Sequence, residues 1–144
     1  MIRDAQKADI GRMVDMGQRF RKDTCYDKYL RDNPERMAEL CETLISKGTL
    51  IVSEKEGEII GMLGFIIYPH FISGDIFAGE VFWWVEPEHR GEGLRLLKEM
   101  KSRARAAGAK FYQMIAPNES EAKVVRLYRR LGCELVESTY QGVL

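Results

Sequence analysis

The sequence predicts one domain of mixed α/β class over residues 1–144, with a central, mostly antiparallel sheet and helices on both of its faces. Apolar residues recur with a helical period before Gly48 and with a strand period directly after it. Strand, helix and strand patterns then follow one another between residues 78 and 116, the order of a β-α-β crossover between parallel strands. The 144 residues contain no internal repeat and no Pro/Ser/Gly-rich linker, so a single core is expected.

The first part of the chain is expected to form a short strand and two helices. Residues 1–4 suit the strand, and Asp9 offers an N-cap oxygen to the first helix. Residues 21–32 are polar and separate this helix from the second one. Asn33 then supplies an N-cap, and Pro34 stands at the first helical position, where its missing N–H costs nothing.

The rest of the chain is expected to form a β-meander, the β-α-β unit, a last helix and one or two short strands in the tail. The expected strands are at residues 49–53, 59–68, 78–85 and 111–116, and a helix is expected at 93–107. The last helix is expected between Asn118 and Gly132, with Val124, Leu127, Tyr128 and Leu131 as its apolar residues. Asn118 and Glu121 have the spacing of a capping box for the last helix. Gly108 and Gly132 are placed to end the two helices.

Composition excludes several classes of partner. The 22 basic residues balance the 22 acidic ones, which argues against nucleic acid because such binding depends on neutralising phosphates. No apolar run approaches the roughly 20 residues of a membrane helix, and the amino terminus lacks the apolar core of a signal peptide. Cys25, Cys41 and Cys133 are too widely spaced for a metal site or a disulfide framework. The sequence therefore predicts a cytoplasmic protein without metal, nucleic-acid or membrane partners.

The segment from Val81 to Arg95 carries the chemical information. A buried strand runs into a glycine-rich turn that opens a helix, and glycines let a backbone approach a ligand closely. The N–H groups and the dipole of a helix N-terminus favour an anion, and the following helix is rich in Lys and Arg. The third glycine of a dinucleotide fingerprint and the Gly-Lys-Ser/Thr of a Walker A loop are both missing. A phosphate-rich ligand of another kind is expected.

The residues Arg90-Gly-Glu-Gly93-Leu-Arg95 resemble the pyrophosphate-binding motif of the GNAT N-acetyltransferase superfamily, Gln/Arg-x-x-Gly-x-Gly/Ala. The resemblance covers nearly the whole chain, from the two early helices to a closing helix that ends in Tyr128-x-x-x-Gly132. It implies the GNAT fold and acetyl-CoA as co-substrate. By this resemblance, the residues expected to bind the coenzyme are Trp84, Val85, Arg90, Gly91, Glu92, Gly93, Leu94, Arg95 and Asn118.

Three of these positions leave alternatives open. Arg95 stands where the family prefers Gly or Ala, so its side chain either clashes with the coenzyme or swings out and pairs with a phosphate. Glu92 puts a carboxylate near the expected anion, unless it points to solvent. Asn118 either caps the last helix or touches the coenzyme, and the two roles are compatible.

The resemblance also implies catalytic candidates. A backbone N–H near Val85 would polarise the thioester carbonyl, and Tyr128 would act as the acid that protonates the leaving thiolate. Tyr128 also lies on the apolar stripe of its helix, so a plain core tyrosine is the alternative. Glu80 is the candidate base or water-orienting group, because an acid within an apolar strand has a raised pKa. A solvated carboxylate at the start of the strand is the alternative for Glu80.

The amine acceptor is expected between the first two helices and the turn before the motif strand. This region contains aromatic side chains and an acidic one, which suit a cationic amine; the candidates are Tyr26, Asp27, Tyr29, His70 and Phe71.

The predicted function is transfer of an acetyl group from acetyl-CoA to a primary amine of a small molecule or protein, by direct attack in a ternary complex. The alternative is a non-catalytic acyl-CoA-binding or interaction domain on the same fold. The aromatic run Phe82-Trp83-Trp84 has two explanations, a homodimer interface or a central strand buried on both faces.

Overall fold

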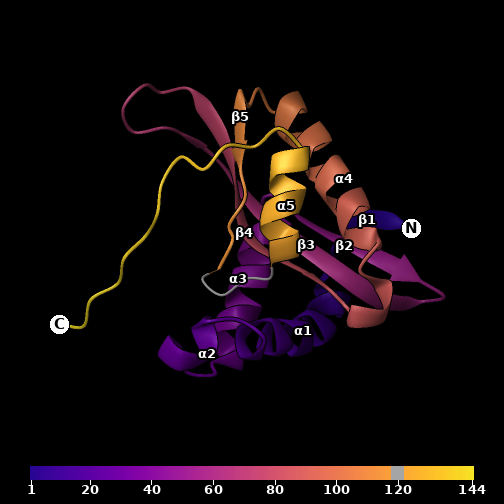
Figure 1. Cartoon of the computed structure of the whole chain (residues 1–144). Coiled ribbons are helices and arrows are strands. Elements are labelled where there is room, and N and C mark those ends of the chain that lie inside the picture. Colours follow the sequence, from indigo (N-terminus) through magenta and orange to yellow (C-terminus); the bar gives the residue numbers. More distant parts are fainter. Residues whose placement is uncertain (118–121) are drawn as a thin grey trace.

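The computed structural model describes residues 1–117 and 122–144 and is built on one five-stranded sheet (Figure 1). The strands, in both chain and spatial order, are β1 (Ile2–Asp4), β2 (Leu50–Lys55), β3 (Glu58–Pro69), β4 (Ile76–Val85) and β5 (Phe111–Gln113). Neighbouring strands are antiparallel except β4 and β5, which are parallel. The predicted mixed, mostly antiparallel sheet with one crossover is confirmed.

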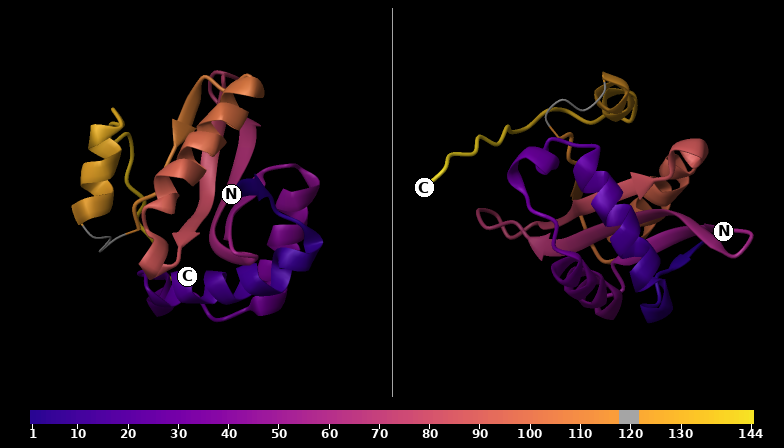
Figure 2. Two further views of the ribbon diagram at one scale, coloured as in Figure 1. Left: turned by 90° about the vertical axis from the view of Figure 1, so that its right-hand side faces the viewer. Right: turned by 90° about the horizontal axis from the view of Figure 1, so that it is seen from below.

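The helices cover both faces of this sheet (Figure 2). They are η1 (Lys7–Asp9), α1 (Ile10–Lys22), α2 (Tyr26–Tyr29), α3 (Pro34–Ser46), η2 (Pro87–His89), α4 (Glu92–Ala106) and α5 (Ala122–Arg130). Buried side chains of α1 and α3, such as Met16 and Leu44, form one core with Trp84. On the opposite face, Leu96 and Met100 of the crossover helix α4 form a second core. The predicted helices on both faces are therefore confirmed.

The sequence-based assignment was wrong in two places. The polar stretch at residues 21–32 contains the short helix α2, whose Asp27 pairs with Arg21 of α1. Residues 133–144, expected to add one or two strands, form none and lead away from the body of the protein (Figure 1). Apolar residues in this tail, such as Tyr140 and Val143, are almost fully exposed. Their pattern indicates strand propensity, but a strand also needs a partner for its backbone hydrogen bonds.

The capping box expected from Asn118 and Glu121 lies outside the described residues. Among the residues that the structure does describe, no helix is both long and apolar enough to cross a membrane.

Strand β4 is paired along both edges for only part of its length. Its pairing with β3 extends from Ile76 to Val85, whereas its pairing with β5 in the described chain is confined to residues 77–79. One residue of β4, Val81, has no partner in the register with β3, because Gly64 faces Phe82 and Phe65 faces Glu80. Such a β-bulge breaks the strict alternation of side chains between the two faces.

Gly64 of β3 illustrates how closely the sheet is packed at this bulge. A Cβ at Gly64 would lie 2.8 Å from Cζ of Phe82 and 2.9 Å from Cδ1 of Leu44, both closer than normal contacts. Leu44 and Phe82 are themselves buried, so neither has free room to move.

We therefore expect Gly64→Ala to lower the free energy of unfolding by about 1–3 kcal/mol, because the core must shift to admit the methyl group. Gly11→Ala is the matched control, since a Cβ at Gly11 in α1 would meet nothing within 4 Å. The control should change stability by no more than about 1 kcal/mol, in the stabilising direction. Urea unfolding of both variants measures this, and equal effects would contradict the tight packing at Gly64.

Candidate functional site

The candidate site lies where β4 parts from β5. Beyond Gly79 the β5 edge of β4 has no partner strand in the described chain, so its backbone groups on that side are free to bind a ligand. Glu86 donates its backbone N–H to Ile60 of β3 at 2.9 Å. Because successive N–H groups of a strand point to opposite sides, the N–H groups of Val85 and Trp83 point away from β3 and into this opening.

The bulge at Val81 decides which side chains of β4 meet at this opening. Val81 and Phe82 both pack with the core under α1 and α3, and Trp83 packs on the face of α4. This places Trp83 on the same face as Ala78 and, two residues after Ala78, Glu80. Without the extra residue, Glu80 and Trp83 would lie on opposite faces.

Helix α5 brings Tyr128 to the same place. The rings of Tyr128 and Trp83 stack with their centroids 6.5 Å apart and their planes 24° from parallel. In Figure 1, α5 lies in front of β4 and alongside α4.

Residue Ile115, after β5, connects the two catalytic candidates. Its backbone N–H donates a hydrogen bond to Oε2 of Glu80 at 3.0 Å. Its backbone carbonyl accepts a hydrogen bond from the Tyr128 hydroxyl at 2.8 Å. The N–H and the carbonyl of Ile115 therefore hold the Glu80 carboxylate and the Tyr128 hydroxyl close to each other.

The electrostatics of the two groups differ from those of surface residues. Burial raises the pKa of Glu80 to about 7, although the hydrogen bond from Ile115 acts in the opposite direction. Burial also raises the pKa of Tyr128, and the charges of Glu80 and Cys133 add to this effect. Glu80 can therefore exchange a proton near neutral pH, while Tyr128 remains protonated at that pH.

The glycine-rich turn places the start of α4 beside these groups. Gly93 is buried, and a Cβ there would lie 3.0 Å from Cζ2 of Trp83, so only glycine fits without displacing the ring. The N-cap, Gly91, has no side chain to satisfy the first N–H groups of the helix. Arg90 lies on the other face of β4, with its guanidinium 4.6 Å from the ring centroid of Trp84. Leu94 is half-exposed on the surface of α4.

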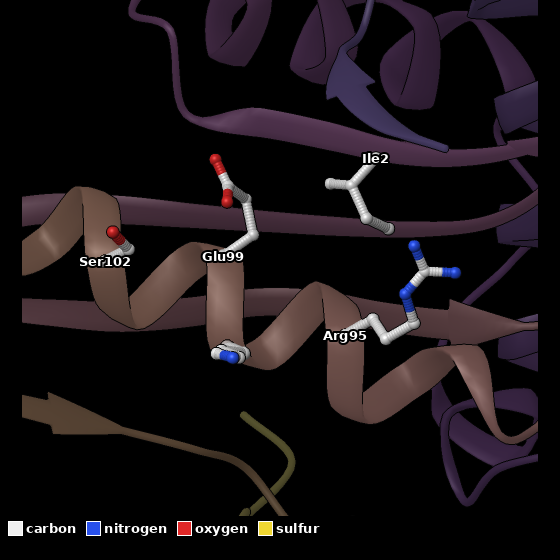
Figure 3. Close-up of a pocket in the computed structure, with 5 residues that line it drawn as sticks. Ile2, Arg95, Glu99 and Ser102 are labelled. Carbon is white, nitrogen blue, oxygen red and sulfur yellow. The ribbon is translucent and has the colours of Figure 1, made fainter.

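The side chain of Arg95 points away from Trp83 and is paired with Glu92. Its Nη1 binds Glu92 at 2.9 Å, and Glu92 also accepts a hydrogen bond from Ser53 of β2 at 3.1 Å. Figure 3 shows Arg95 pointing from α4 toward Ile2 of β1, where it lines a pocket of about 350 Å³. The ion pair between Glu92 and Arg95 thus directs both side chains toward β1 and β2. Gly93, between them, faces Trp83 instead.

The expected acceptor residues are divided between two regions. Tyr26 lies near Glu80: burial raises its pKa, and the charges of Cys25 and Glu80 contribute to the shift. Asp27 is paired with Arg21, and Tyr29 is more than half exposed.

His70 and Phe71 stack on each other in the turn between β3 and β4. His70 also packs on Phe77, at the end of β4 opposite to the glycine-rich turn. The structure therefore brings Tyr26 within electrostatic range of Glu80 and leaves His70 and Phe71 at the far end of β4.

Sequence reasoning missed two components of this region. Ile115 acts through its backbone N–H and carbonyl, which every residue type except proline has, so its side chain gives no hint of this role. Glu86, directly after β4, is buried and binds Arg12 at 2.9 Å and Arg19 at 2.7 Å. The two arginines stand seven residues apart and so share one face of α1, a spacing that could have suggested an acidic partner. Asn118, the remaining coenzyme candidate, lies outside the described residues.

Comparison with known proteins gives a family and a fold. The model of the acetyltransferase (GNAT) family matches residues 16–133. No protein of curated function is similar to the chain by sequence. Among solved structures, a transcriptional regulator from Bacillus halodurans C-125 has a TM-score of 0.81 at 22% identity, over 100% of this chain and 99% of the other.

Two further structures are similar at 16% identity. A predicted acetyltransferase with acetyl-CoA from Clostridium acetobutylicum has a TM-score of 0.74, over 99% of this chain and 95% of the other. A ribosomal-protein-alanine N-acetyltransferase from Brucella melitensis biovar Abortus 2308 has a TM-score of 0.72, over 100% and 99%. At these identities the likeness concerns the fold.

The raised pKa of Glu80 has a consequence for stability that does not depend on any activity. Folding favours the neutral carboxyl, so its contribution is fully present below the ordinary pKa of 4.5 and is lost as the pH rises through about 7. We expect Glu80→Gln, which cannot ionise, to gain stability relative to the parent by about 2 kcal/mol between pH 5 and pH 8. Urea unfolding at both values measures the difference. A difference that stays constant with pH would show that the carboxyl group is solvated.

Proposed function

Because the chain belongs to the acetyltransferase (GNAT) family, we propose that it transfers an acetyl group from acetyl-CoA to a primary amine of a small molecule or protein. The observation that carries this proposal is the pair formed by Glu80 and Tyr128. The two groups are held by opposite polar groups of Ile115, beside the free edge of β4. One has a pKa suited to a base and the other keeps a proton to give.

The residues at the opening fit a coenzyme thioester. The free edge of β4 offers N–H groups from Trp83 and Val85. The Trp83 Nε1 is buried and, within residues 1–117 and 122–144, has no hydrogen-bond partner. The start of α4, with Gly91 and Gly93, suits a pyrophosphate because it presents backbone N–H groups and a positive dipole end. When bound, coenzyme A supplies the acetyl group as a thioester, and the Val85 N–H is placed to polarise its carbonyl oxygen.

The protein's own groups account for the proton transfers. Glu80, as a carboxylate, accepts one proton from the attacking amine, and the new C–N bond forms as the C–S bond breaks. Tyr128 donates its hydroxyl proton to the departing sulfur, so that one proton leaves nitrogen and one arrives at sulfur. Both groups then return to their starting protonation states through solvent. The carboxylate form of Glu80 predominates above about pH 7, so the rate is expected to rise through this value.

The amine is proposed to approach from the side of α2, where Tyr26 lies near Glu80. Phe20 of α1 packs on Tyr26 with ring centroids 5.8 Å apart and on Trp84 at 6.4 Å. Aromatic rings next to a carboxylate suit a cationic amine. This amine loses one proton to solvent before it attacks, and the neutral amine then gives its second proton to Glu80.

Acetyl-CoA is expected to raise the thermal unfolding midpoint by several degrees, since a ligand at roughly a hundred times its Kd adds about 2.7 kcal/mol. Arg95→Ala should give the same rise, because Arg95 points toward β1 and is paired with Glu92. Adenosine is the control ligand.

Release of free thiol with a panel of primary amines then tests transfer. A thermal rise without thiol release for any amine would favour a non-catalytic acyl-CoA-binding domain, and no rise at all would exclude both functions.

Tyr128→Phe is expected to lower kcat by about a hundredfold, because it removes the acidic proton and keeps the ring on Trp83. Tyr112→Phe is the matched control, since the Tyr112 hydroxyl hydrogen-bonds to the Cys133 sulfur at 3.2 Å and to no other group in the described chain. Steady-state kinetics with a working amine measure both variants. An unchanged kcat for Tyr128→Phe would remove Tyr128 from the mechanism and leave it a core tyrosine.

A further inference from the structure

Glu86 is a buried carboxylate that is held by hydrogen bonds and ion pairs through both its side chain and its backbone. Only 7% of its side chain is exposed, and its Oε1 accepts hydrogen bonds from Arg19 Nη1 at 2.7 Å and Arg12 Nη2 at 2.9 Å. Two guanidinium groups on one carboxylate oxygen compensate the cost of burying its charge. Arg12 is held in turn by Glu58 at 3.1 Å and by the carbonyl of Ile59 at 3.2 Å.

The backbone of Glu86 is fixed as well as its side chain. Its N–H donates to Ile60 of β3 at 2.9 Å, and its carbonyl accepts from the N–H of His89 at 2.9 Å. Glu86 is therefore the last residue of the β4 segment that is bound to the sheet, and it also forms the base of the turn that follows. The five residues from Pro87 to Gly91 separate it from the start of α4 at Glu92.

The position of Glu86 links two parts of the site. It directly follows Val85, whose N–H points into the opening, and it precedes the glycine-rich turn. Its arginine partners come from α1, the helix whose Phe20 packs on Tyr26. A shift of Glu86 would move the Val85 N–H and the start of α4 together, because both are within a few residues of it.

We propose that Glu86, clamped by Arg12 and Arg19, is a positioning residue that holds the β4–α4 turn in the geometry that binds the coenzyme. This inference rests on the proposed function. Glu86 does not touch the acetyl group. It acts through the backbone of Val85 and of the turn, and it ties that backbone to the helix on the acceptor side.

The test is calorimetric titration with acetyl-CoA, at a temperature well below the unfolding midpoint of every variant. Glu86→Gln keeps the shape of the side chain and removes its charge, and Arg19→Met keeps an apolar stem and removes the guanidinium. We expect Glu86→Gln to raise the Kd for acetyl-CoA roughly tenfold or more, because small displacements of binding groups are costly. Arg19→Met should raise it less, since Arg12 remains on the carboxylate.

A double variant separates positioning from independent effects. If Arg19 acts through Glu86, the variant with both changes should bind acetyl-CoA no more weakly than Glu86→Gln alone, whereas independent effects on Kd would multiply. The kcat at saturating acetyl-CoA should fall as well, because the Val85 N–H that polarises the thioester carbonyl moves with Glu86. Glu88→Gln, an exposed carboxylate in the same turn, is the matched control and should leave the Kd unchanged.

Three results would overturn the inference. In the first, Glu86→Gln lowers the unfolding midpoint but binds acetyl-CoA as tightly as the parent, which assigns Glu86 a purely structural role. In the second, Glu86→Gln does not fold and Arg19→Met, whose side chain is nearly half exposed in the parent, shows an unchanged Kd. In the third, the parent itself does not bind acetyl-CoA. Only this last result also removes the proposed function, so the two failures are distinguishable.

Discussion

The incomplete pairing of β4 is the constraint on which the rest of the site depends. The strand is bound to β3 along its whole length, which fixes its position, and it is free of β5 beyond Gly79. Free backbone groups inside a protein are costly unless a ligand or solvent satisfies them. The fold supports this arrangement with α4 on one side of the opening and Tyr128 of α5 stacked on Trp83. The site can therefore bind a ligand because the backbone N–H and C=O groups on the β5 side of β4 have no partner strand beyond Gly79 in the described chain.

The bulge at Val81 turns that strand into a site with acid and base groups. It sets Glu80 and Trp83 on one face, three residues apart, and so allows Tyr128 to stack on Trp83 while Ile115 connects it to Glu80. The burial that raises the pKa of Glu80 comes from this packing. Proton chemistry near pH 7 is therefore a consequence of strand register and helix placement.

The sequence predicted what periodicity and local motifs can carry. The helices, the crossover and the glycine-rich turn follow from apolar spacing and from Gly91 and Gly93. The bulge could not be predicted, because it depends on how Gly64 and Phe82 fit across two strands. The direction of Arg95 depends on Glu92 and on Ser53, which is distant in sequence. Tail residues such as Tyr140 have strand propensity, but propensity alone does not show whether a partner strand is available to pair with them.

Glu80 and Glu86 show how one residue type acquires two roles within six positions of the same segment. Both carboxylates are withdrawn from water at opposite ends of the free half of β4. Glu86 faces two guanidinium groups, so its charge is balanced where it lies. Glu80 forms no ion pair within the described chain, and it accepts a hydrogen bond from the neutral N–H of Ile115. Burial without a cation favours the protonated form, and this raises the pKa of Glu80 to about 7. The arginines of α1 thus anchor Glu86 and the backbone next to it, whereas Glu80 is bound by a single backbone N–H in the described chain.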